Sequence, residues 1–491
     1  MYYTKGNYIN GTWKRSKGDI FNVISPVSDT PIWECNNSLI EEVDECVNFA
    51  EEALFSWAAL SVDERIVFLK RFIDLVKDNV DVLAESISVE IGKPLWESKT
   101  EVKAILGKLE PSIAAYKERK CEIVKDMASG AVSHIYYKPI GVVAVIGPYN
   151  FPIHMANGHI IPALISGNTV IFKPSEKGAM TAERIIDLWD KARLPKGVIN
   201  LIQGNGNVGM MLVSHKKVNG VFFTGSYDAG EKIRKACGSE KMCALEMGGN
   251  SPLVVWDTSD LDATVLATVQ SSFITAGQRC SSARRVIVPN NDFGNQFINK
   301  LVEYAKNIIV GKYTDDVEPY YGALRSPEMV DSIISEQTNL INKGCKVLLE
   351  SKRLTKMGKC FISPGIIDIT TLKEKPDKEL IGPFIKVIRV ENFKEAIDEA
   401  NNTSYGLAAG IFTEDRALYE KFSFYIKAGL VNWNQQLTGA AGTAPFGGVK
   451  KSGNYRPSGY FAVDYCVYAV ASIEIEKAKA ITTLPIGIKK E

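Results

Sequence analysis

The apolar positions between residues 141 and 223 form short unbroken runs, separated by stretches with helical spacing. Short unbroken apolar runs are typical of strands that are buried on both faces. They stand at residues 141–146, 169–172, 198–202 and 220–223. The helical stretches between them are residues 157–166, 179–192 and 208–213. This alternation predicts a parallel sheet with helices on both of its faces.

A second set of alternating elements follows. We expect a strand at residues 251–255, a helix at 261–276, a strand at 285–288 and further alternation up to 429–433. The pattern predicts a second α/β domain. Residues 460–476 alternate like a terminal strand, and residues 132–137 are its possible partner. Neither segment fits naturally into the two main sheets.

The N-terminal region predicts short strands first and helices afterwards. Residues 8–35 contain a hairpin-like signal and then a Ser-Pro break. Ser61 and Glu64 form a capping box, which marks the start of a helix. The apolar residues after it keep helical spacing at Ile66, Leu69, Ile73 and Val76.

Length and composition narrow the class of protein. A chain of 491 residues is too long for one core, so we expect two or three domains. Its 58 Lys and Arg nearly balance 57 Asp and Glu, which leaves no general attraction to nucleic acid or to an anionic membrane. No segment approaches the roughly 20 apolar residues that cross a bilayer. We therefore predict a cytoplasmic protein that binds neither nucleic acid nor membrane.

The cysteines and histidines indicate a reducing compartment without a metal site. The nine cysteines are scattered and show no paired short spacing, which argues against a disulfide framework. There are only four histidines and no Cys-x-x-Cys motif. We expect no metal.

Two segments indicate covalent chemistry. Cys280 follows Gly-Gln-Arg, and Glu246 begins Glu-Met-Gly-Gly-Asn-Ser-Pro. A thiol can attack a carbonyl group, and a carboxylate can activate the water that later releases the product. Four further motifs accompany this pair: Gly-Pro-Tyr-Asn-Phe-Pro at 147–152, Phe-Lys-Pro-Ser-Glu at 172–176, Phe-Thr-Gly-Ser at 223–226 with Gly230, and Ala-Pro-Phe-Gly-Gly at 444–448 with Ser452 and Gly453.

In this order and at this spread, the motifs resemble the NAD(P)-dependent aldehyde dehydrogenase superfamily over nearly the whole chain. The resemblance implies two doubly wound α/β domains and a small β element that joins subunits into a homodimer or homotetramer. We place the cofactor domain at residues 1–120 and 141–247 and the catalytic domain at 248–445. The oligomerisation element then comprises residues 121–140 and 460–485.

The cofactor prediction is a loop between a strand and a helix, together with three separate side chains. The loop is expected to lead into a helix at 231–237 and consists of Gly225, Ser226, Tyr227, Asp228, Ala229 and Gly230. By resemblance, Lys173 and Glu176 contact the adenine ribose, and Glu379 holds the nicotinamide ribose. Since an acidic group repels a 2′-phosphate, Glu176 favours NAD over NADP.

The resemblance also assigns roles in the reaction. Cys280 is the nucleophile, and Arg279 beside it could help to form the thiolate. The side-chain amide of Asn150 and the backbone N–H of Cys280 are candidates for stabilising the oxyanion. Glu246 is the general base for thioester hydrolysis, and its presence points to a free acid product, since relatives that transfer the acyl group to coenzyme A generally lack it.

A closer resemblance rests on the segments 91–97, 147–152, 157–164, 245–250, 276–280 with 283–285, and 453–458. These segments resemble the subfamily that oxidises N-succinylglutamate 5-semialdehyde in arginine catabolism. Because this small-molecule substrate carries two carboxylates, arginines should bind it. The candidates are Arg279, Arg284, Arg285 and Arg456. Arg456 is favoured because it lies in a turn near the end of the catalytic domain, whereas Arg285 opens a strand, where a structural ion pair is the alternative.

Other functions stay open at this point. Within the superfamily, the substrate could be another carboxylated semialdehyde, such as succinate or glutamate semialdehyde. A cofactor-free thiol hydrolase or acyltransferase would need a base such as histidine near Cys280, and no histidine motif supports one. A catalytically silent protein on this fold would not need Cys280, Glu246 and Asn150 together.

Overall fold

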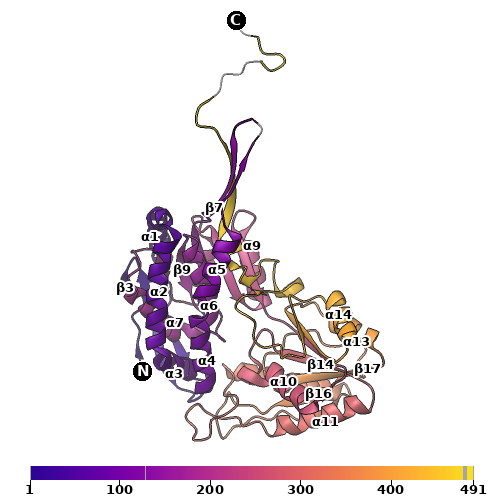
Figure 1. Cartoon of the computed structure of the whole chain (residues 1–491). Coiled ribbons are helices and arrows are strands. Elements are labelled where there is room, and N and C mark those ends of the chain that lie inside the picture. The colour runs from indigo at the N-terminus through magenta and orange to yellow at the C-terminus, as the bar shows by residue number, and fades with distance from the viewer. Residues whose placement is uncertain (1, 128, 479–483, 490–491) are drawn as a thin grey trace.

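Two large sheets form the two lobes that Figure 1 shows side by side. The computed structural model describes residues 2–127, 129–478 and 484–489. The first lobe comprises the N-terminal half of the chain, and the second lobe most of the C-terminal half. The two predicted α/β domains are confirmed, whereas their exact boundaries stay a prediction.

The sheet of the first lobe runs in the order β12-β11-β8-β9-β10-β2-β3. It is parallel from β12 to β10, and an N-terminal hairpin extends it in antiparallel fashion. In chain order the strands are β2 (Asn7–Ile9), β3 (Thr12–Lys14), β8 (Val142–Ile146), β9 (Thr169–Lys173), β10 (Ile199–Leu201), β11 (Gly220–Gly225) and β12 (Met242–Met247). The four predicted strands are therefore β8 to β11.

Helices cover both faces of this sheet because its strands are apolar on both sides. In β8, Val143 and Val145 belong to one buried cluster, whereas Val142, Ala144 and Ile146 belong to another. The helices of this lobe are α1 (Ile40–Ala59), α2 (Val62–Asp78), α3 (Val80–Ile91), α4 (Leu95–Leu106), α5 (Leu109–Arg119), α6 (His154–Ile165), α7 (Ala179–Lys191), α8 (Gly206–Ser214) and α9 (Tyr227–Cys237). The predicted capping box at Ser61 begins α2.

The second sheet runs in the order β15-β16-β17-β14-β13-β18-β19. Its strands contribute to a separate hydrophobic core in this lobe. Its strands are β13 (Ser251–Val255), β14 (Ala283–Pro289), β15 (Lys346–Leu349), β16 (Gly365–Asp368), β17 (Phe384–Val390), β18 (Ala408–Phe412) and β19 (Leu430–Trp433). Its helices are α10 (Leu261–Phe273), α11 (Asp292–Lys306), α12 (Pro327–Asn342), α13 (Phe393–Asn401) and α14 (Arg416–Tyr425). The expected helix at 261–276 thus ends early, at Phe273.

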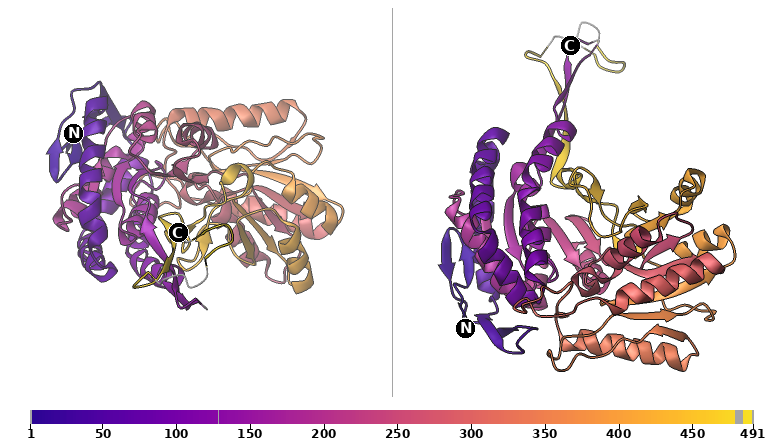
Figure 2. Two further views of the ribbon diagram at one scale, coloured as in Figure 1. Left: turned by 90° about the horizontal axis from the view of Figure 1, so that it is seen from above. Right: turned by 60° about the horizontal axis from the view of Figure 1, so that its bottom comes forward.

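A three-stranded antiparallel ribbon projects from the body of the molecule (Figures 1 and 2). It consists of β6 (Ile123–Asp126), β7 (Val132–Pro139) and β22 (Val467–Glu474). Strand β22 pairs with β7 from Val467 opposite Pro139 to Glu474 opposite Val132. The predicted pairing of the terminal strand is confirmed, and the ribbon is defined here as β6, β7 and β22.

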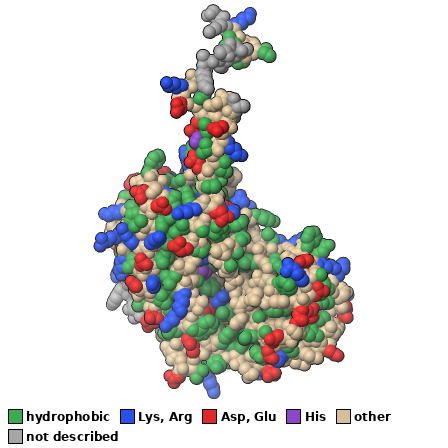
Figure 3. Space-filling model, in the orientation of Figure 1, with side chains coloured by type: hydrophobic (Ala, Val, Ile, Leu, Met, Phe, Trp, Pro, Cys, Tyr) green, Lys and Arg blue, Asp and Glu red, His purple; other side chains and the backbone are tan. Residues whose placement is uncertain are grey.

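Smaller elements complete the chain. A minor sheet contains β1 (Tyr2–Tyr3), β4 (Ile20–Ile24) and β5 (Pro31–Asn36), and β20 (Pro445–Phe446) pairs with β21 (Ser458–Gly459). Short 3-10 turns lie at Glu176–Gly178, Ile274–Gly277, Lys450–Ser452 and Ala462–Asp464. On the face shown in Figure 3, charges of both signs are scattered over the body. Over the described ranges, none of the helices is long and apolar enough to span a bilayer.

Candidate active site

Cys280 is presented by an unusual turn after α10. Thr275, Ala276 and Gly277 have φ values of 59°, 51° and 69°. Residues other than glycine rarely adopt this left-handed backbone conformation. Gly277 lies against the carbonyl of Gly382, where a side chain would not fit. The turn therefore fixes Cys280 against the loop that carries Glu379 and Gly382.

The Cys280 side chain is partly exposed, and its thiol is free. Burial raises the pKa of this thiol to about 12, and the carboxylates of Glu246 and Glu379 add to the rise. The backbone N–H of Ser281 and the charge of Arg284 act in the opposite direction. A pKa raised in this way favours the neutral thiol.

The expectation that Arg279 would help to form the thiolate needs correction. Nε of Arg279 donates to Thr275 Oγ1 at 2.7 Å, and Nη2 lies 3.0 Å from Glu97 Oε1. Glu97 is buried, so it holds the guanidinium in a partly buried ion pair. It is Arg284, and not Arg279, whose charge lowers the pKa of Cys280.

Glu246 lies near the end of β12 and is 3% exposed. Burial raises its pKa to about 7, against hydrogen bonds from Ser458 and Thr224 and the charge of Lys108. Thr224 Oγ1 is 3.5 Å from Oε2, whereas Oε1 has no hydrogen-bond partner among the described residues. A carboxyl group with this pKa suits a general base near neutral pH.

Asn150 lies in the loop after β8 and joins this loop to the cysteine turn. Its side-chain Nδ2 donates to the carbonyl oxygen of Gln278 at 2.7 Å. A Cβ on Gly249 would lie 3.0 Å from the carbonyl oxygen of Cys280. The structure thus brings Asn150, Cys280 and the glycines after Glu246 together. Since an amide has two N–H donors, Asn150 keeps one of them for a ligand.

Glu379 occupies the space that a side chain at Gly248 would fill. The backbone N–H of Gly249 donates to its carboxylate, and Arg284 Nη2 lies 3.5 Å from Oε1. Burial raises the pKa of Glu379 despite these partners. Glycine is needed at residue 248 because the carboxylate approaches the backbone there.

Arg284 ties the three loops together, which argues against its predicted role in substrate binding. Its guanidinium is 2% exposed and donates to four backbone carbonyls and to Glu379. The carbonyls belong to Gly249, Gly277, Arg279 and Leu380. We therefore revise this prediction, because no N–H group of Arg284 remains free for a carboxylate of the substrate.

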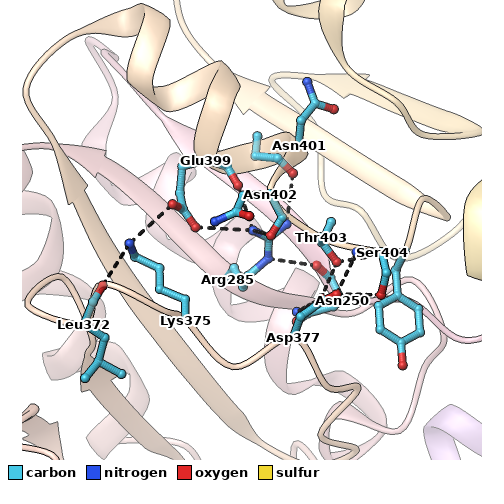
Figure 4. Close-up of polar contacts among 12 residues, drawn as sticks. Asn250, Arg285, Leu372, Lys375, Asp377, Glu399, Asn401, Asn402, Thr403 and Ser404 are labelled. Carbon is cyan, nitrogen blue, oxygen red and sulfur yellow. Dashed lines mark hydrogen bonds and ion pairs between the residues drawn. The ribbon is translucent and has the colours of Figure 1, made fainter.

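Arg285 has a structural place beside this cluster (Figure 4). It donates to the carbonyl oxygen of Asn250 at 3.0 Å and lies 3.6 Å from the carboxylate of Glu399. Asn250 Nδ2 in turn donates to Asp377 at 3.1 Å, and Asp377 also accepts from Thr403 and Ser404. This network anchors the segment between Glu246 and β13 to the loop that precedes Glu379.

The predicted cofactor residues lie where β9 and β11 end. Lys173 Nζ is 3.9 Å from the Glu176 carboxylate, and burial lowers the pKa of Lys173 to about 8. The expected loop at 225–230 is shorter than predicted, because α9 already begins at Tyr227 and Ser226 caps it through the backbone N–H of Ala229. Gly230 packs directly against Met247. The backbone N–H groups in the first turn of α9 are thus positioned to meet a phosphate group.

Arg456 is exposed and donates to the carbonyl of Tyr455 at 3.2 Å. Its segment lies beside Glu246, since Gly453 forms a bridge to Glu246 and Ser458 donates to the Glu246 carboxylate. The role of Arg456 stays a prediction.

Sequence reasoning missed the polar groups around Glu246. His159 Nε2 lies 3.1 Å from Thr224 Oγ1 and 3.8 Å from Glu246 Oε1, and its Nδ1 is 2.8 Å from the Tyr465 hydroxyl. Burial lowers the pKa of His159 to about 3, so this ring is neutral. No motif connects residues so far apart in the sequence. Within the described part of the chain, no cluster of His, Cys, Asp and Glu is arranged to hold a metal ion.

The sequence is similar to a known family and to named proteins over nearly its full length. The sequence profile described as "Aldehyde dehydrogenase family" matches residues 13–470. The chain is 43% identical to N-succinylglutamate 5-semialdehyde dehydrogenase of Paraburkholderia xenovorans (strain LB400), over 98% of this chain and 99% of that protein. It is 44% identical to the protein of the same name from Ectopseudomonas mendocina (strain ymp), with the same shares covered.

Solved structures with bound cofactor share the fold. A betaine aldehyde dehydrogenase from Staphylococcus aureus in complex with NAD+ superimposes with a TM-score of 0.91 at 28% identity, covering 98% of each chain. An NADP-dependent glyceraldehyde-3-phosphate dehydrogenase from Bacillus halodurans C-125 complexed with NADP gives a TM-score of 0.90 at 27% identity, covering 96% of this chain and 98% of that one. Both cofactors thus occur on this fold.

Proposed function

The chain belongs to the aldehyde dehydrogenase family, and on that premise we propose that it oxidises N-succinylglutamate 5-semialdehyde to N-succinylglutamate with NAD. As a family member it is an NAD(P)-dependent oxidoreductase that acts on small-molecule aldehydes. The observation that carries the proposed substrate is the full-length similarity to two proteins of that name, at 43% and 44% identity. The convergence of Cys280, Asn150 and Glu246 on one site supports the chemistry.

In the proposed reaction, the Cys280 thiolate attacks the aldehyde carbon and forms a C–S bond, while the carbonyl π electrons move to oxygen. The free N–H of Asn150 and the backbone N–H of Cys280 stabilise the resulting alkoxide. When bound, NAD+ supplies the acceptor for the hydride that leaves this carbon, and a thioester of Cys280 remains. Glu246 then takes a proton from water, the water oxygen attacks the thioester, and the C–S bond breaks to release the acid and the thiolate.

The residues present fit a dinucleotide. Lys173 and Glu176 stand at the carboxyl end of β9, where doubly wound sheets bind ligands. The N–H groups in the first turn of α9 that do not donate to Ser226 would meet the pyrophosphate, and Gly230 allows the close packing of this helix on β12. Glu379, whose carboxylate lies against Gly248, would accept hydrogen bonds from the nicotinamide ribose. A cation held over Cys280 would also favour its thiolate.

We propose NAD rather than NADP as the preferred cofactor. The carboxylate of Glu176 is partly exposed and lies near Lys173, so it can accept from a 2′-hydroxyl but would repel a 2′-phosphate. Measured kcat/KM values should favour NAD, and Glu176→Gln should narrow the ratio by about tenfold or more. A higher kcat/KM with NADP in the wild type would contradict the proposal.

We also keep the homodimer or homotetramer and the cytoplasmic location as predictions. The ribbon supports the former, because it projects from the body and carries exposed apolar side chains.

A substrate panel tests the proposed function. Initial rates of NADH formation are measured with N-succinylglutamate 5-semialdehyde, succinate semialdehyde, glutamate semialdehyde and hexanal. The proposal predicts the highest kcat/KM for the first. A higher value for succinate or glutamate semialdehyde would assign that substrate instead. A higher value for hexanal would remove the carboxylated class altogether.

A further inference from the structure

The charges of three cationic side chains act on His154, whose ring lies 5.9 Å from the ring of Phe151, the residue after Asn150. Lys93 lies with its Nζ 3.7 Å from the centre of the Phe151 ring, and Arg279 lies 5.3 Å from the same ring. The third is Lys108, whose charge acts on His154, as do the charges of Lys93 and Arg279. A cluster of positive charge at this place faces the loop that is proposed to meet the aldehyde.

Two of these cations are already neutralised. Lys93 Nζ donates to Glu101 Oε2 at 2.7 Å. Both side chains are buried, with 1% of Lys93 and 0% of Glu101 exposed. Arg279 pairs with the buried carboxylate of Glu97 at 3.0 Å. Since each has a permanent partner inside the protein, neither needs a ligand to compensate its charge.

Lys108 differs because its amine has no such partner. It lies between α4 and α5, and among the described residues no hydrogen bond or ion pair reaches its Nζ. The amine extends over Gly158 of α6, where a Cβ would lie 3.3 Å from Nζ. Burial lowers the pKa of this amine, against the charge of Glu246. Lys108 as a whole is half-buried, and an ammonium group that is partly removed from water without a partner would be stabilised by an anion that arrives with the substrate.

The surroundings of Lys108 contain two further unsatisfied groups. His154 Nδ1 and Glu246 Oε1 are both buried without a hydrogen-bond partner among the described residues. His154 and Gly158 lie one helical turn apart on the same side of α6. The Lys108 charge acts on both His154 and Glu246.

The distance to Glu246 matters for the chemistry. No ion pair within hydrogen-bond reach joins Lys108 to Glu246 in the described structure, although each acts on the other electrostatically. A direct salt bridge would hold the pKa of the Glu246 carboxyl group far below 7 and so weaken it as a base. Lys108 therefore acts on Glu246 electrostatically without forming an ion pair with it in the described structure.

We infer that Lys108 is a specificity-determining residue that binds a carboxylate of the aldehyde substrate. The inference rests on the proposed function and deepens it, because it names the group that selects a carboxylated aldehyde. One ammonium group binds one of the two carboxylates, and Gly158 provides the space that the amine needs. The exposed Arg456 remains the candidate for the second carboxylate.

The test is Lys108→Met, which keeps an unbranched apolar side chain and removes the charge. Kinetics are measured with N-succinylglutamate 5-semialdehyde, succinate semialdehyde and hexanal at saturating NAD. For the carboxylated aldehydes we expect kcat/KM to fall roughly 10- to 100-fold, mainly through a higher KM, with a loss on hexanal about tenfold smaller. Lys108→Arg should restore much of the selectivity, since it restores a cation. Lys103→Met, an exposed position of α4, is the matched control.

The outcomes separate the two proposals. Equal losses on hexanal and on the carboxylated aldehydes, or no loss on either, would overturn the role of Lys108. A wild type that prefers succinate semialdehyde, with a selective loss in Lys108→Met, would overturn the proposed substrate but support Lys108. A wild type that prefers hexanal would overturn both. If Lys108→Met does not fold, as judged by circular dichroism, failure of a folded Lys108→Gln to lose selectivity would overturn the inference instead.

Discussion

Burial raises the pKa of both Glu246 and Cys280, but the consequences for their reactivity differ. This difference fits the order of the proposed steps. Burial raises the pKa of Glu246 to about 7, so it can act as a base near neutral pH. Burial raises the pKa of Cys280 to about 12, so the thiol is unreactive until another charge arrives. A protected thiol and a ready base suit an enzyme whose nucleophile is needed only when cofactor is bound.

The pKa of Glu246 predicts the pH dependence of thioester hydrolysis. A base acts in its unprotonated form, and a raised pKa means that Glu246 is protonated below about pH 7. The hydrolysis rate should therefore rise roughly tenfold per pH unit up to that point and level off above it. Single-turnover product release, measured after the NADH burst between about pH 5 and pH 9, checks this. A flat profile in the wild type would exclude Glu246 as the base, and Glu246→Gln should give a flat, low profile.

The raised pKa of Cys280 predicts slow alkylation in the absence of cofactor. Because the neutral thiol is a poor nucleophile, iodoacetamide should react slowly with Cys280, and NAD+ should accelerate the reaction by about tenfold or more. Peptide mass spectrometry follows each cysteine separately, and the exposed Cys121 serves as an internal control whose rate should not change with NAD+. Faster alkylation of Cys280 than of Cys121 in the free protein would contradict the protected thiol.

Sequence alone nominates Cys280, Glu246 and Asn150 as site residues, because each stands in a short motif. It could not identify Lys108 or His159, since these act through contacts between distant segments. Arg284 was misjudged for a related reason. A buried arginine whose partners are backbone carbonyls leaves no trace in the pattern of residue types.

At the level of elements, three loops are locked together by close backbone approaches. The cysteine turn lies against Gly382, Glu379 lies beneath Gly248, and Arg284 donates to carbonyls of all three loops. The pattern of apolar residues predicted β8 to β11, because buried parallel strands are continuous apolar runs. The left-handed turn at Thr275 and Ala276 was not predictable, since neither residue type favours it.

Gly248→Ala tests the link between the glycine turn and Glu379. The new methyl group would meet the Glu379 carboxylate, which must move away from the nicotinamide side. We expect KM for NAD to rise by about tenfold or more while the fold is kept. Steady-state kinetics with varied NAD measure this, and Gly206→Ala is the control because a Cβ there meets no atom within 4 Å. Unchanged KM in Gly248→Ala would contradict the proposed role of Glu379.

At the level of the whole molecule, the ribbon projects from the body, so the body does not cover its apolar side chains. Several of its apolar side chains are exposed, including Val124 at 54% and Ile473 at 70%. The alternation in the terminal strand and its pairing with β7 were predictable from the sequence. The N-terminal hairpin was expected as a hairpin, but its place at the edge of the cofactor sheet depends on the long-range pairing of Tyr8 with Leu201.

Charged substitutions on the ribbon test whether it joins subunits. If Val124 and Ile473 are covered by a neighbouring subunit, Val124→Asp combined with Ile473→Asp should shift the molecular mass toward that of the monomer, because buried unpaired charges are costly. Size-exclusion chromatography with light scattering measures the mass. Ile20→Asp, an exposed isoleucine of β4 at 61%, is the control. An oligomer that persists in the double variant would place the interface elsewhere.

In the proposed reaction, Cys280 carries the substrate as a thioester. The most direct measurement is the mass of Glu246→Gln after incubation with NAD+ and N-succinylglutamate 5-semialdehyde, followed by acid quenching and peptide mapping. We predict one equivalent of NADH and an acyl adduct on the peptide that contains Cys280, with neither in Cys280→Ala. NADH formation without an adduct on Cys280, or an adduct on another cysteine, would contradict it.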